Sequence, residues 1–295
     1  MRILLYGKQI SEEQIPPVKL LFSILAKEDA KVYIHRPYLD LIRKKFHPSA
    51  ALTAIDGYSD LKELQIDYVL TLGGDGTILG VVTLIRDLQI PIMGINLGRL
   101  GFMASIEQQY IDKAVDFLKQ GKYRLQRRTM LSLSSSLPLF GESTFALNDF
   151  TILKRDNSSM IIIHAYINGE FLNSYWADGL IVSTPTGSTG YSLSCGGPIV
   201  FPDSNSIVIT PVAPHNLNVR PLVVSDDCEL SFEIEGRAEN FLCTLDARFE
   251  IINSDYRLSV RKCPFGIDLV QLDEMSFSKT MRSKLMWGFD SRKHF

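Results

Sequence analysis

The hydrophobic and polar positions in the first third of the chain alternate between short apolar runs and stretches with helical spacing. The apolar runs are RILLYG, AKVYIH and DYVLTLGG, and periodic segments from Val18 to Ala26 and from Tyr38 to Phe46 separate them. This order predicts a parallel sheet covered by helices. A further helix is expected from Thr77 to Leu88, followed by the strand PIMGIN. A ligand crevice is therefore expected where these strands end.

The pattern changes at about Tyr123. Ser, Thr, Asn and Gly now separate short strands such as MLSLSSSL, MIIIHAYING, LIVST and CELSFEIEG, which is typical of an antiparallel β domain. Near the end, Phe277, Met281 and Leu285 recur at helical spacing in SFSKTMRSKLMWG. This spacing predicts a helix that docks on a core.

Composition excludes several classes of protein. With 295 residues, of which 45% are hydrophobic, the chain can bury the cores of two domains or of one large domain. The formal net charge of -2 gives no global field for polyanions, so nucleic acid is not an expected partner. The four cysteines are scattered without a CxxC pair, which favours a reducing cytoplasm over a disulfide framework or a zinc site. The N-terminus lacks the apolar core of a signal peptide and no apolar run reaches membrane-spanning length, so we expect a soluble protein.

The stretch VLTLGGDGTILG places one acid, Asp75, between glycines at the end of an apolar strand. Such glycines allow positive φ and close approach of a ligand, and the free amides of the loop suit phosphate. An acid among phosphates is repulsive unless a cation intervenes or the acid faces a hydroxyl. The loop thus indicates Mg²⁺-dependent phosphoryl transfer in which Asp75 orients or deprotonates the accepting hydroxyl. The alternative is a tight turn in which Asp75 caps the following helix.

A second motif runs from Asp178 to Val200 and reads DGLIVSTPTGSTGYSLSCGGPIV. Its hydroxyls and free amides suit directional recognition of ribose and base edges, and the Tyr191 ring could stack on adenine. The alternative is a polar surface loop with Tyr191 as a core aromatic.

These motifs resemble known signatures. GGDGT is similar to the signature shared by NAD kinases, diacylglycerol-type lipid kinases and phosphofructokinases, whereas TPTGSTGYSLSCGGPI closely resembles the long signature of NAD kinases alone. NLGRLGF, LND, PHNLNVRPLVV and KLMWG also resemble NAD kinase segments, so the resemblance covers nearly the whole chain. It implies an α/β, Rossmann-like N-terminal domain with a parallel sheet, a β-rich C-terminal domain, and a C-terminal segment that returns to the first domain. The implied domains are residues 1–122 plus 272–295, which carry GGDGT, and an all-β NAD-binding domain of residues 123–271.

The resemblance implies that the protein transfers the γ-phosphoryl of ATP, with Mg²⁺, to the 2′-hydroxyl of the adenosine ribose of NAD, producing NADP and ADP. Asp75 is then the catalytic acid, and no protein ligand of the metal is assigned, because nucleotide phosphates and water can hold it. A cytoplasmic homotetramer or homodimer is also implied, with no nucleic-acid or membrane partner. The implied phosphate-binding residues are Gly73, Gly74 and Thr77. The implied NAD-binding residues are Asp75, Gly76, Phe102, Asn148, Asp149, Asp178, Thr186, Thr189, Gly190, Tyr191, Ser192, Leu193 and Ser194, with His215 as a further candidate.

Several of these positions also have ordinary structural explanations. Phe102 can be a core aromatic, Asp178 a turn residue at a strand end, Asn148-Asp149 a plain turn, and His215 a structural histidine. A lipid or sugar kinase and a non-enzymatic dinucleotide sensor are the rival functions.

The chain departs from the family pattern at a few positions. Asp149 replaces the usual glutamate, Gly190 and Cys195 each replace alanine, and Asp246-Ala247-Arg248 replaces Asp-Gly-Gln. We expect function to survive the shorter acid and Cys195 to be a small buried filler, not a nucleophile. The contact at Asp246-Ala247-Arg248 is the least transferable, because alanine discourages positive φ and arginine adds a cation.

Overall fold

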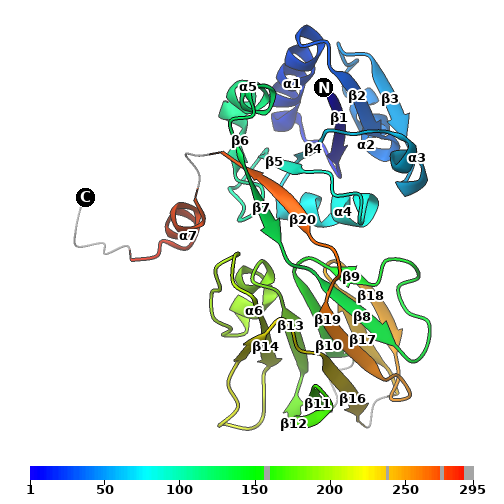
Figure 1. The fold of residues 1–295 in the computed structure, drawn as a ribbon, viewed down its shortest axis with the longest axis vertical. Helices are drawn as coiled ribbons and strands as arrows, with labels where there is room; N and C mark the ends of the chain where they lie inside the picture. The colour runs from blue at the N-terminus through cyan, green and yellow to red at the C-terminus, as the bar shows by residue number, and fades with distance from the viewer. Residues whose placement is uncertain (156–159, 237–238, 273–275, 289–295) are drawn as a thin grey trace. The chain divides into compact units, whose positions relative to one another are not determined.

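The computed structural model describes residues 1–155, 160–236, 239–272 and 276–288. The chain divides into two compact units (Figure 1). The first consists of Met1–Arg127 together with the segment that begins at Ile267, and the second is Arg128–Gly266. In the part of the chain that is described, no helix has the length and apolar character needed to cross a membrane.

An eight-stranded sheet organises the first unit. Its strand order is β3-β2-β1-β4-β5-β20-β7, with β6 paired to β5, and the described pairings among β1 to β6 and between β20 and β5 are parallel. Every residue of β5 and all but the first of β4 are buried, as expected of central strands covered on both faces. The strands are β1 (Arg2–Gly7), β2 (Lys31–His35), β3 (Leu52–Ile55), β4 (Tyr68–Leu72), β5 (Ile92–Asn96), β6 (Ile106–Glu107), β7 (Arg124–Arg128) and β20 (Ile267–Gln271).

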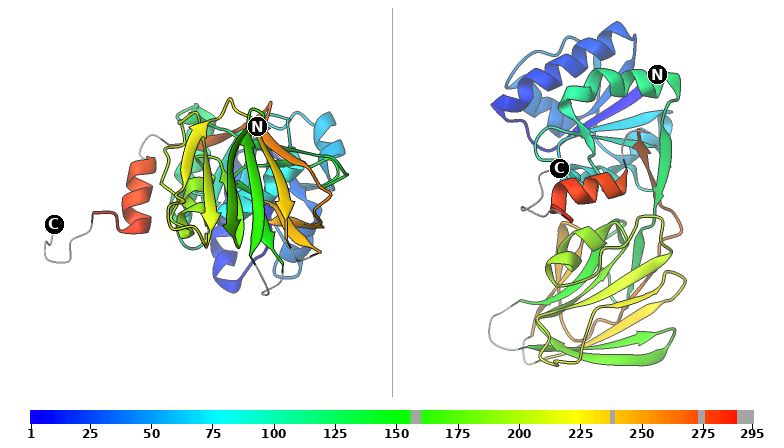
Figure 2. Two further views of the ribbon diagram at one scale, coloured as in Figure 1. Left: turned by 90° about the horizontal axis from the view of Figure 1, so that it is seen from below. Right: turned by 90° about the vertical axis from the view of Figure 1, so that its left-hand side faces the viewer.

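Four helices of this unit, α1, α2, α4 and α7, correspond to predicted periodic segments, whereas α3 and α5 were not predicted. Helices α1 and α5 lie side by side and share a buried cluster with strand residues (Figures 1 and 2), whereas α4 packs against β1, β4 and β5. The segment expected from Thr77 to Leu88 is α4, which begins two residues earlier, at Asp75 itself. The helical elements are η1 (Glu12–Gln14), α1 (Ile15–Lys27), α2 (Arg36–Arg43), α3 (Tyr58–Glu63), α4 (Asp75–Ile85), η2 (Gln108–Tyr110), α5 (Ile111–Gln120) and α7 (Phe277–Leu285).

The C-terminal segment returns to the first unit, as predicted. Strand β20 pairs with β5 through Leu269 and Ile92, and the Phe277 ring of α7 packs against Phe102 with centroids 5.9 Å apart. The apolar stripe of α7 docks less fully than its spacing suggested, because Phe277 and Met281 are only half-buried and Thr280 is its buried residue.

The second unit is a sandwich of two antiparallel, six-stranded sheets. The sheet orders are β15-β14-β13-β10-β17-β18 and β12-β11-β16-β19-β8-β9, and Phe150 of the first sheet stacks on Phe232 of the second at 5.7 Å. A 3₁₀ turn, η3 (Gly187–Thr189), and a one-turn helix, α6 (Tyr191–Ser194), interrupt the predicted all-β texture between β13 and β14. The strands are β8 (Leu131–Ser135), β9 (Phe145–Ala146), β10 (Asp149–Lys154), β11 (Ile161–Ile167), β12 (Glu170–Ala177), β13 (Gly179–Ser183), β14 (Ser206–Val212), β15 (Leu222–Ser225), β16 (Leu230–Glu235), β17 (Phe241–Leu245), β18 (Arg248–Ile252) and β19 (Leu258–Lys262).

Candidate active site

The glycine loop turns the chain from β4 into α4 within two residues. Gly73 has φ +148°, and a Cβ there would overlap the Thr77 hydroxyl, so only glycine fits. The Gly73 N–H donates to the carbonyl of Ile95 at 3.0 Å, which ties the loop to the neighbouring strand. Gly74 is the N-cap of α4, and a Cβ at Gly76 in its first turn would meet nothing within 4 Å. The first turn of α4 is therefore open to a ligand.

The Asp75 carboxylate faces the NLGRLGF segment and does not cap its own helix. Its Oδ2 accepts the N–H of Phe102 at 2.8 Å, and its Oδ1 accepts those of Met103 and Ala104 at 3.0 and 2.9 Å. Because all three donors are backbone groups, the orientation of the carboxylate is fixed by the fold. A carboxylate can accept about four hydrogen bonds, so this half-buried one retains capacity for a ligand hydroxyl.

Asn96 holds the segment that binds Asp75. Its side-chain amide donates to the carbonyls of Arg99 at 2.6 Å and Ala104 at 3.3 Å, and its Oδ1 accepts the N–H of Gly98 at 2.7 Å. Asn96 is only 2% exposed, so these bonds satisfy a side chain that is largely removed from water. Sequence reasoning treated NLGRLGF only as a family match and missed this positioning role.

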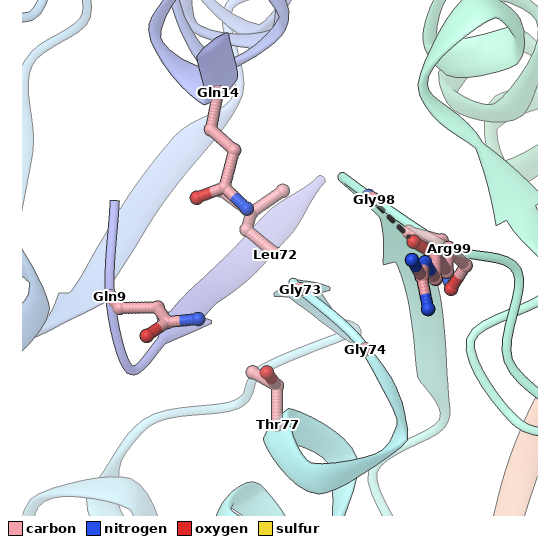
Figure 3. Close-up of a pocket in the computed structure, with 9 residues that line it drawn as sticks. Gln9, Gln14, Leu72, Gly73, Gly74, Thr77, Gly98 and Arg99 are labelled. Atoms are coloured by element: carbon pink, nitrogen blue, oxygen red, sulfur yellow. Dashed lines mark hydrogen bonds between the residues drawn. The ribbon is translucent and has the colours of Figure 1, made fainter. Parts of the chain in front are cut away.

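A cavity of about 190 Å³ lies beside the glycine loop, where β1, β4 and β5 end (Figure 3). The predicted phosphate-binding residues Gly73, Gly74 and Thr77 all line it. Asp75 is not part of the lining, although residues on both sides of it are. The loop thus separates its acid from the cavity that its glycines form. The lining consists of Gln9, Gln14, Leu72, Gly73, Gly74, Thr77, Asn96, Gly98 and Arg99.

Six of the nine lining residues were not among the predicted site residues, and three of these six are long polar side chains, those of Gln9, Gln14 and Arg99. Gln9 and Gln14 follow β1 and belong to no motif, so the sequence offered no signal for them. Arg99 lies within NLGRLGF and could have been noticed as the cation of that segment. Among the described residues, no group of three or more His, Cys, Asp or Glu could hold a metal ion.

Phe102 is placed as a packed aromatic. It is 9% exposed, contacts Phe277, and lies under the Lys284 ammonium, which is 5.1 Å from the ring centroid. In this arrangement its backbone N–H, not its ring, contacts Asp75.

In the second unit the two predicted NAD-binding segments are packed as one structure. The Thr184 N–H donates to the carbonyl of Asn148 at 2.9 Å, and its hydroxyl donates to the carbonyl of Leu147 at 2.6 Å. A Cβ at Gly187 would overlap the Asn148 carbonyl oxygen, so the TPTG turn can approach LND only because residue 187 is glycine.

Two acids lie close together beneath this turn. The Asp246 carboxylate accepts the N–H groups of Leu147, Asn148 and Asp149 at 2.9, 2.7 and 3.2 Å. Asp149 is 8% exposed, and its burial, together with the charge of Asp246, raises its pKa to about 7. Burial also raises the pKa of Asp246, against the effect of its three N–H donors. Asp149 can therefore change its charge near neutral pH.

Of the remaining predicted residues, Tyr191 is exposed, whereas the side chains of Asp178 and Ser192 are bonded to other protein groups. Tyr191 is 40% exposed, and burial of its hydroxyl, followed by the charges of Cys195, Asp149 and Asp178, raises its pKa. Asp178 forms an ion pair with Lys154 at 2.6 Å. The buried Ser192 hydroxyl is hydrogen-bonded to that of Thr210 at 2.8 Å.

The other members of the second motif vary in their exposure. The Thr189 hydroxyl donates to the carbonyl of the buried Thr186 at 3.2 Å. Gly190 and Leu193 are half-buried and Ser194 is exposed. His215 is exposed and donates its backbone N–H to the carbonyl of Trp176.

Comparison with known proteins decides the family. Residues 24–123 match the ATP-NAD kinase N-terminal domain, and residues 147–272 match the ATP-NAD kinase C-terminal domain. An NAD kinase of Cytophaga hutchinsonii is 50% identical over 289 residues, which cover 98% of either chain. This chain belongs to the NAD kinase family. An NAD kinase of Flavobacterium psychrophilum is 42% identical over 99% of this chain and 100% of its own. The chain is therefore an enzyme that transfers phosphate from ATP to NAD, as predicted, and the rival lipid-kinase and sensor hypotheses are set aside.

Solved structures of NAD kinases share the fold. The crystal structure of yeast NADH kinase complexed with NADH matches with a TM-score of 0.88 at 23% identity and covers 100% of this chain and 90% of its own. An NAD kinase from Archaeoglobus fulgidus in complex with ATP matches with a TM-score of 0.75, also at 23% identity, and covers 97% and 99%.

The departures from the NAD kinase pattern have local structural explanations. The Arg248 guanidinium lies near the Phe140 and Phe145 rings and donates to the carbonyls of Ser143 and Phe145, so it supports its own unit. Positive φ occurs at Asp246 (+54°), not at the residue after it, so alanine at position 247 carries no such strain.

Cys195 is less buried than the small buried filler that the sequence predicted. The thiol is half-buried, and burial raises its pKa, which disfavours the nucleophilic thiolate.

Proposed function

We propose that Asp75 is the catalytic carboxylate of this NAD kinase and that, as a general base, it binds and deprotonates the 2′-hydroxyl of the adenosine ribose of NAD. The observation that carries the proposal is the fixation of its carboxylate by three backbone N–H groups, on a loop whose neighbouring residues line the cavity beside it. A carboxylate so placed is rigid and can meet a hydroxyl without entering the phosphate pocket.

The reaction requires little covalent help from the protein. The ribose oxygen forms a bond to the γ-phosphorus of ATP while the bond from that phosphorus to the bridging oxygen breaks, which gives NADP and ADP. The hydroxyl proton passes to Asp75. The transition state of phosphoryl transfer is loose, so alignment and charge stabilisation supply most of the rate enhancement.

On the donor side, we assign the phosphates of ATP to Gly73, Gly74 and Thr77. The N–H groups of Gly73 and Thr77 already donate to the carbonyls of Ile95 and Gly74. The Gly74 N–H and the Thr77 hydroxyl are therefore the proposed donors to phosphate, and the helix dipole favours an anion at that end. Mg²⁺ enters as part of the MgATP substrate. Because no carboxylate is among the nine residues that line the cavity, the phosphates and water are its ligands in this proposal.

On the acceptor side, we assign NAD binding to the polar groups around the Asn148 and TPTG turns, where Asn148 Oδ1 is buried without a hydrogen-bond partner. Phe102 is assigned to the adenine side, and His215 is a further candidate. We also propose a cytoplasmic homotetramer or homodimer, and a division of roles between the two units, whose boundaries lie after Arg127 and before Ile267 and not at residues 122 and 272 as expected. The proposed contacts comprise Gly76, Asn148, Asp149, Asp178, Thr186, Thr189, Gly190, Tyr191, Ser192, Leu193 and Ser194.

Asp75→Asn tests the assignment. Purified protein is incubated with MgATP and NAD, and NADP is measured with an NADP-specific dehydrogenase. Turnover should fall by about 10²-fold or more while NAD still binds. Asp112→Asn is the matched control, because Asp112 is also an acid in the first turn of a helix, α5, and is exposed. Wild-type turnover in a folded Asp75→Asn protein would exclude Asp75 as the catalytic carboxylate.

A further inference from the structure

We propose that Arg99 binds the terminal phosphates of the ATP donor, with the side-chain amides of Gln9 and Gln14 on the opposite wall of the same cavity. This inference rests on the proposed role of the cavity as the donor-phosphate site. It adds residues that determine donor affinity, and it assigns the positive charge that the glycine loop itself lacks.

Arg99 is the only charged residue among the nine that line the cavity. Its side chain is exposed, and the described contacts include no acid paired with it. A guanidinium with no acid beside it is a ready partner for an incoming anion, because no existing ion pair has to break first.

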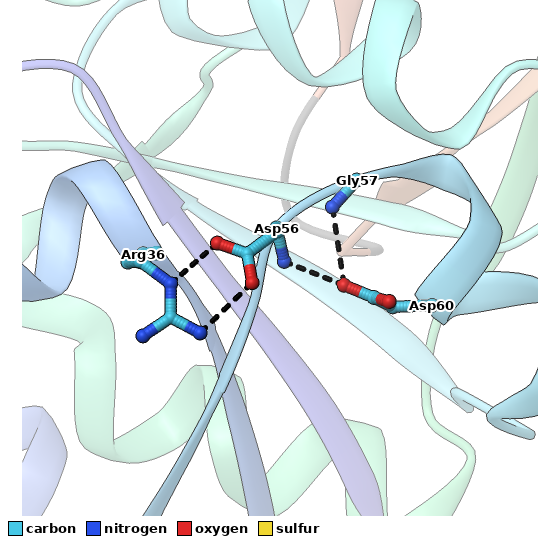
Figure 4. A network of polar contacts seen from close by, with 4 residues as sticks. All are labelled: Arg36, Asp56, Gly57 and Asp60. Carbon is cyan, nitrogen blue, oxygen red and sulfur yellow. Dashed lines mark hydrogen bonds and ion pairs between the residues drawn. The ribbon is translucent and has the colours of Figure 1, made fainter.

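Arg36 shows the contrast at the same edge of the sheet. It follows β2, and its guanidinium pairs through two hydrogen bonds with Asp56, which follows β3; the bond from Nη2 is 2.8 Å (Figure 4). Asp60 in turn accepts the backbone N–H groups of Asp56 and Gly57. Arg36 is thus neutralised within the protein, whereas Arg99, which follows β5, is not.

The walls of the cavity are arranged for hydrogen-bond donation. Asn96 fixes the Arg99 backbone by donating to its carbonyl at 2.6 Å. Gln14 Oε1 accepts the N–H of Ser11 at 3.1 Å, which leaves the amide hydrogens of Gln14 to donate to a ligand. Figure 3 shows Gln9 and Gln14 on one side of the pocket and Arg99 on the other, with Gly73 and Gly74 between them.

The chemistry of the lining favours phosphate over the rest of the nucleotide. Leu72 is the only large apolar residue in it, and no aromatic ring is present to stack on a base. The volume of about 190 Å³ is also below the roughly 300–1,000 Å³ typical of pockets that enclose a drug-sized ligand. A guanidinium and two amides instead match phosphate oxygens, and a guanidinium can bind them through two parallel hydrogen bonds.

The test compares Arg99→Gln and Arg99→Lys with the control Arg43→Gln, which removes the same charge from the exposed end of α2. The KM values for MgATP and NAD are measured separately, and binding of MgATP and of inorganic tripolyphosphate is measured by calorimetry without NAD. Arg99→Gln should raise the KM and Kd for MgATP by about tenfold or more, with the KM for NAD unchanged within about twofold. Arg99→Lys should be intermediate, because it keeps the charge but not the planar fork. Arg43→Gln should match the wild type.

The tripolyphosphate measurement isolates the phosphate chain. Tripolyphosphate should bind the wild type and Arg43→Gln and bind Arg99→Gln at least about tenfold more weakly. An unchanged affinity of folded Arg99→Gln for MgATP, or equal losses for MgATP and NAD, would overturn the proposal. If the wild type formed no NADP, the proposed function itself would fail. If the wild type formed NADP and Arg99→Gln bound MgATP with unchanged affinity, only the role of Arg99 would fail.

Discussion

Gly101 lies directly against the Asp75 carboxylate, so that a Cβ at residue 101 would overlap Oδ1 of Asp75. The two residues are far apart in sequence, yet the close approach allows three consecutive N–H groups after Gly101 to reach the acid. The absence of a side chain at Gly101 in NLGRLGF therefore allows the Asp75 carboxylate of GGDGT to take its observed position.

Gly101→Ala should therefore impair catalysis without removing any functional group. The added methyl group must displace either the carboxylate or the loop, and misplacement of a reacting group by about 1 Å can cost about 10² in rate. We expect turnover to fall by about that factor, and the stability of the first unit to fall by about 1–3 kcal/mol if the N–H groups lose their acceptor. Steady-state kinetics and thermal unfolding measure the two effects.

Gly57→Ala is the control for this prediction, since a Cβ there meets nothing within 4 Å. Full turnover in Gly101→Ala would show that the carboxylate tolerates a shift, and the role of its three N–H donors would need revision.

GGDGT and NLGRLGF are separated along the sequence but meet in the fold, and this difference explains which features the sequence could predict. The strand–helix alternation and the texture change near Tyr123 predicted both units because periodicity is a local property. The contact between Asp75 and the N–H groups after Gly101 depends on β4 and β5 being neighbours, which no local pattern specifies. Gln9 and Gln14 are polar residues without a motif, and only the folded sheet brings them to the glycine loop.

Arg248, unlike Gln9 and Gln14, was singled out from the sequence, but its contacts were not predicted. The sequence identified it as a departure from the family and as an added cation, but could not say where the charge would go. The structure shows that its guanidinium is satisfied by carbonyl groups of Ser143 and Phe145. An arginine forms such contacts across a sequence separation of more than 100 residues only once both segments are folded.

The two buried acids of the second unit predict a pH dependence. Burial and the charge of Asp246 raise the pKa of Asp149 to about 7, so the folded protein holds this proton more tightly than the unfolded chain. The resulting contribution to stability is full below the usual carboxyl range and is lost as pH rises to about 7. Asp149→Asn should flatten the fall of unfolding free energy between about pH 4 and pH 7, with a slope change of at most about 1.4 kcal/mol per pH unit.

NAD affinity should depend on the same proton. An ionised Asp149 accepts hydrogen bonds from ribose hydroxyls that the protonated form accepts less well, so NAD should bind more tightly above pH 7 than below it. Calorimetric titration of NAD at pH 6, 7 and 8 measures the effect in the wild type and in Asp149→Asn. Identical pH profiles in the two proteins would show that Asp149 is not the titrating group.

Two glycines of the TPTGSTG turn should respond differently to the same substitution. A Cβ at Gly187 would overlap the Asn148 carbonyl oxygen, which is backbone and cannot move aside, so Gly187→Ala should separate the TPTG turn from LND. A Cβ at Gly190 would approach the Gly187 carbonyl oxygen only to 3.3 Å, a contact that a shift of a few tenths of an ångström relieves. Gly190→Ala should therefore keep NAD affinity within about twofold, whereas Gly187→Ala should weaken it by about tenfold or more. NAD calorimetry on both variants, with thermal unfolding to confirm that each is folded, measures the difference. Equal losses of affinity would mean that the contact of Gly187 with Asn148 does not control the NAD-binding turn.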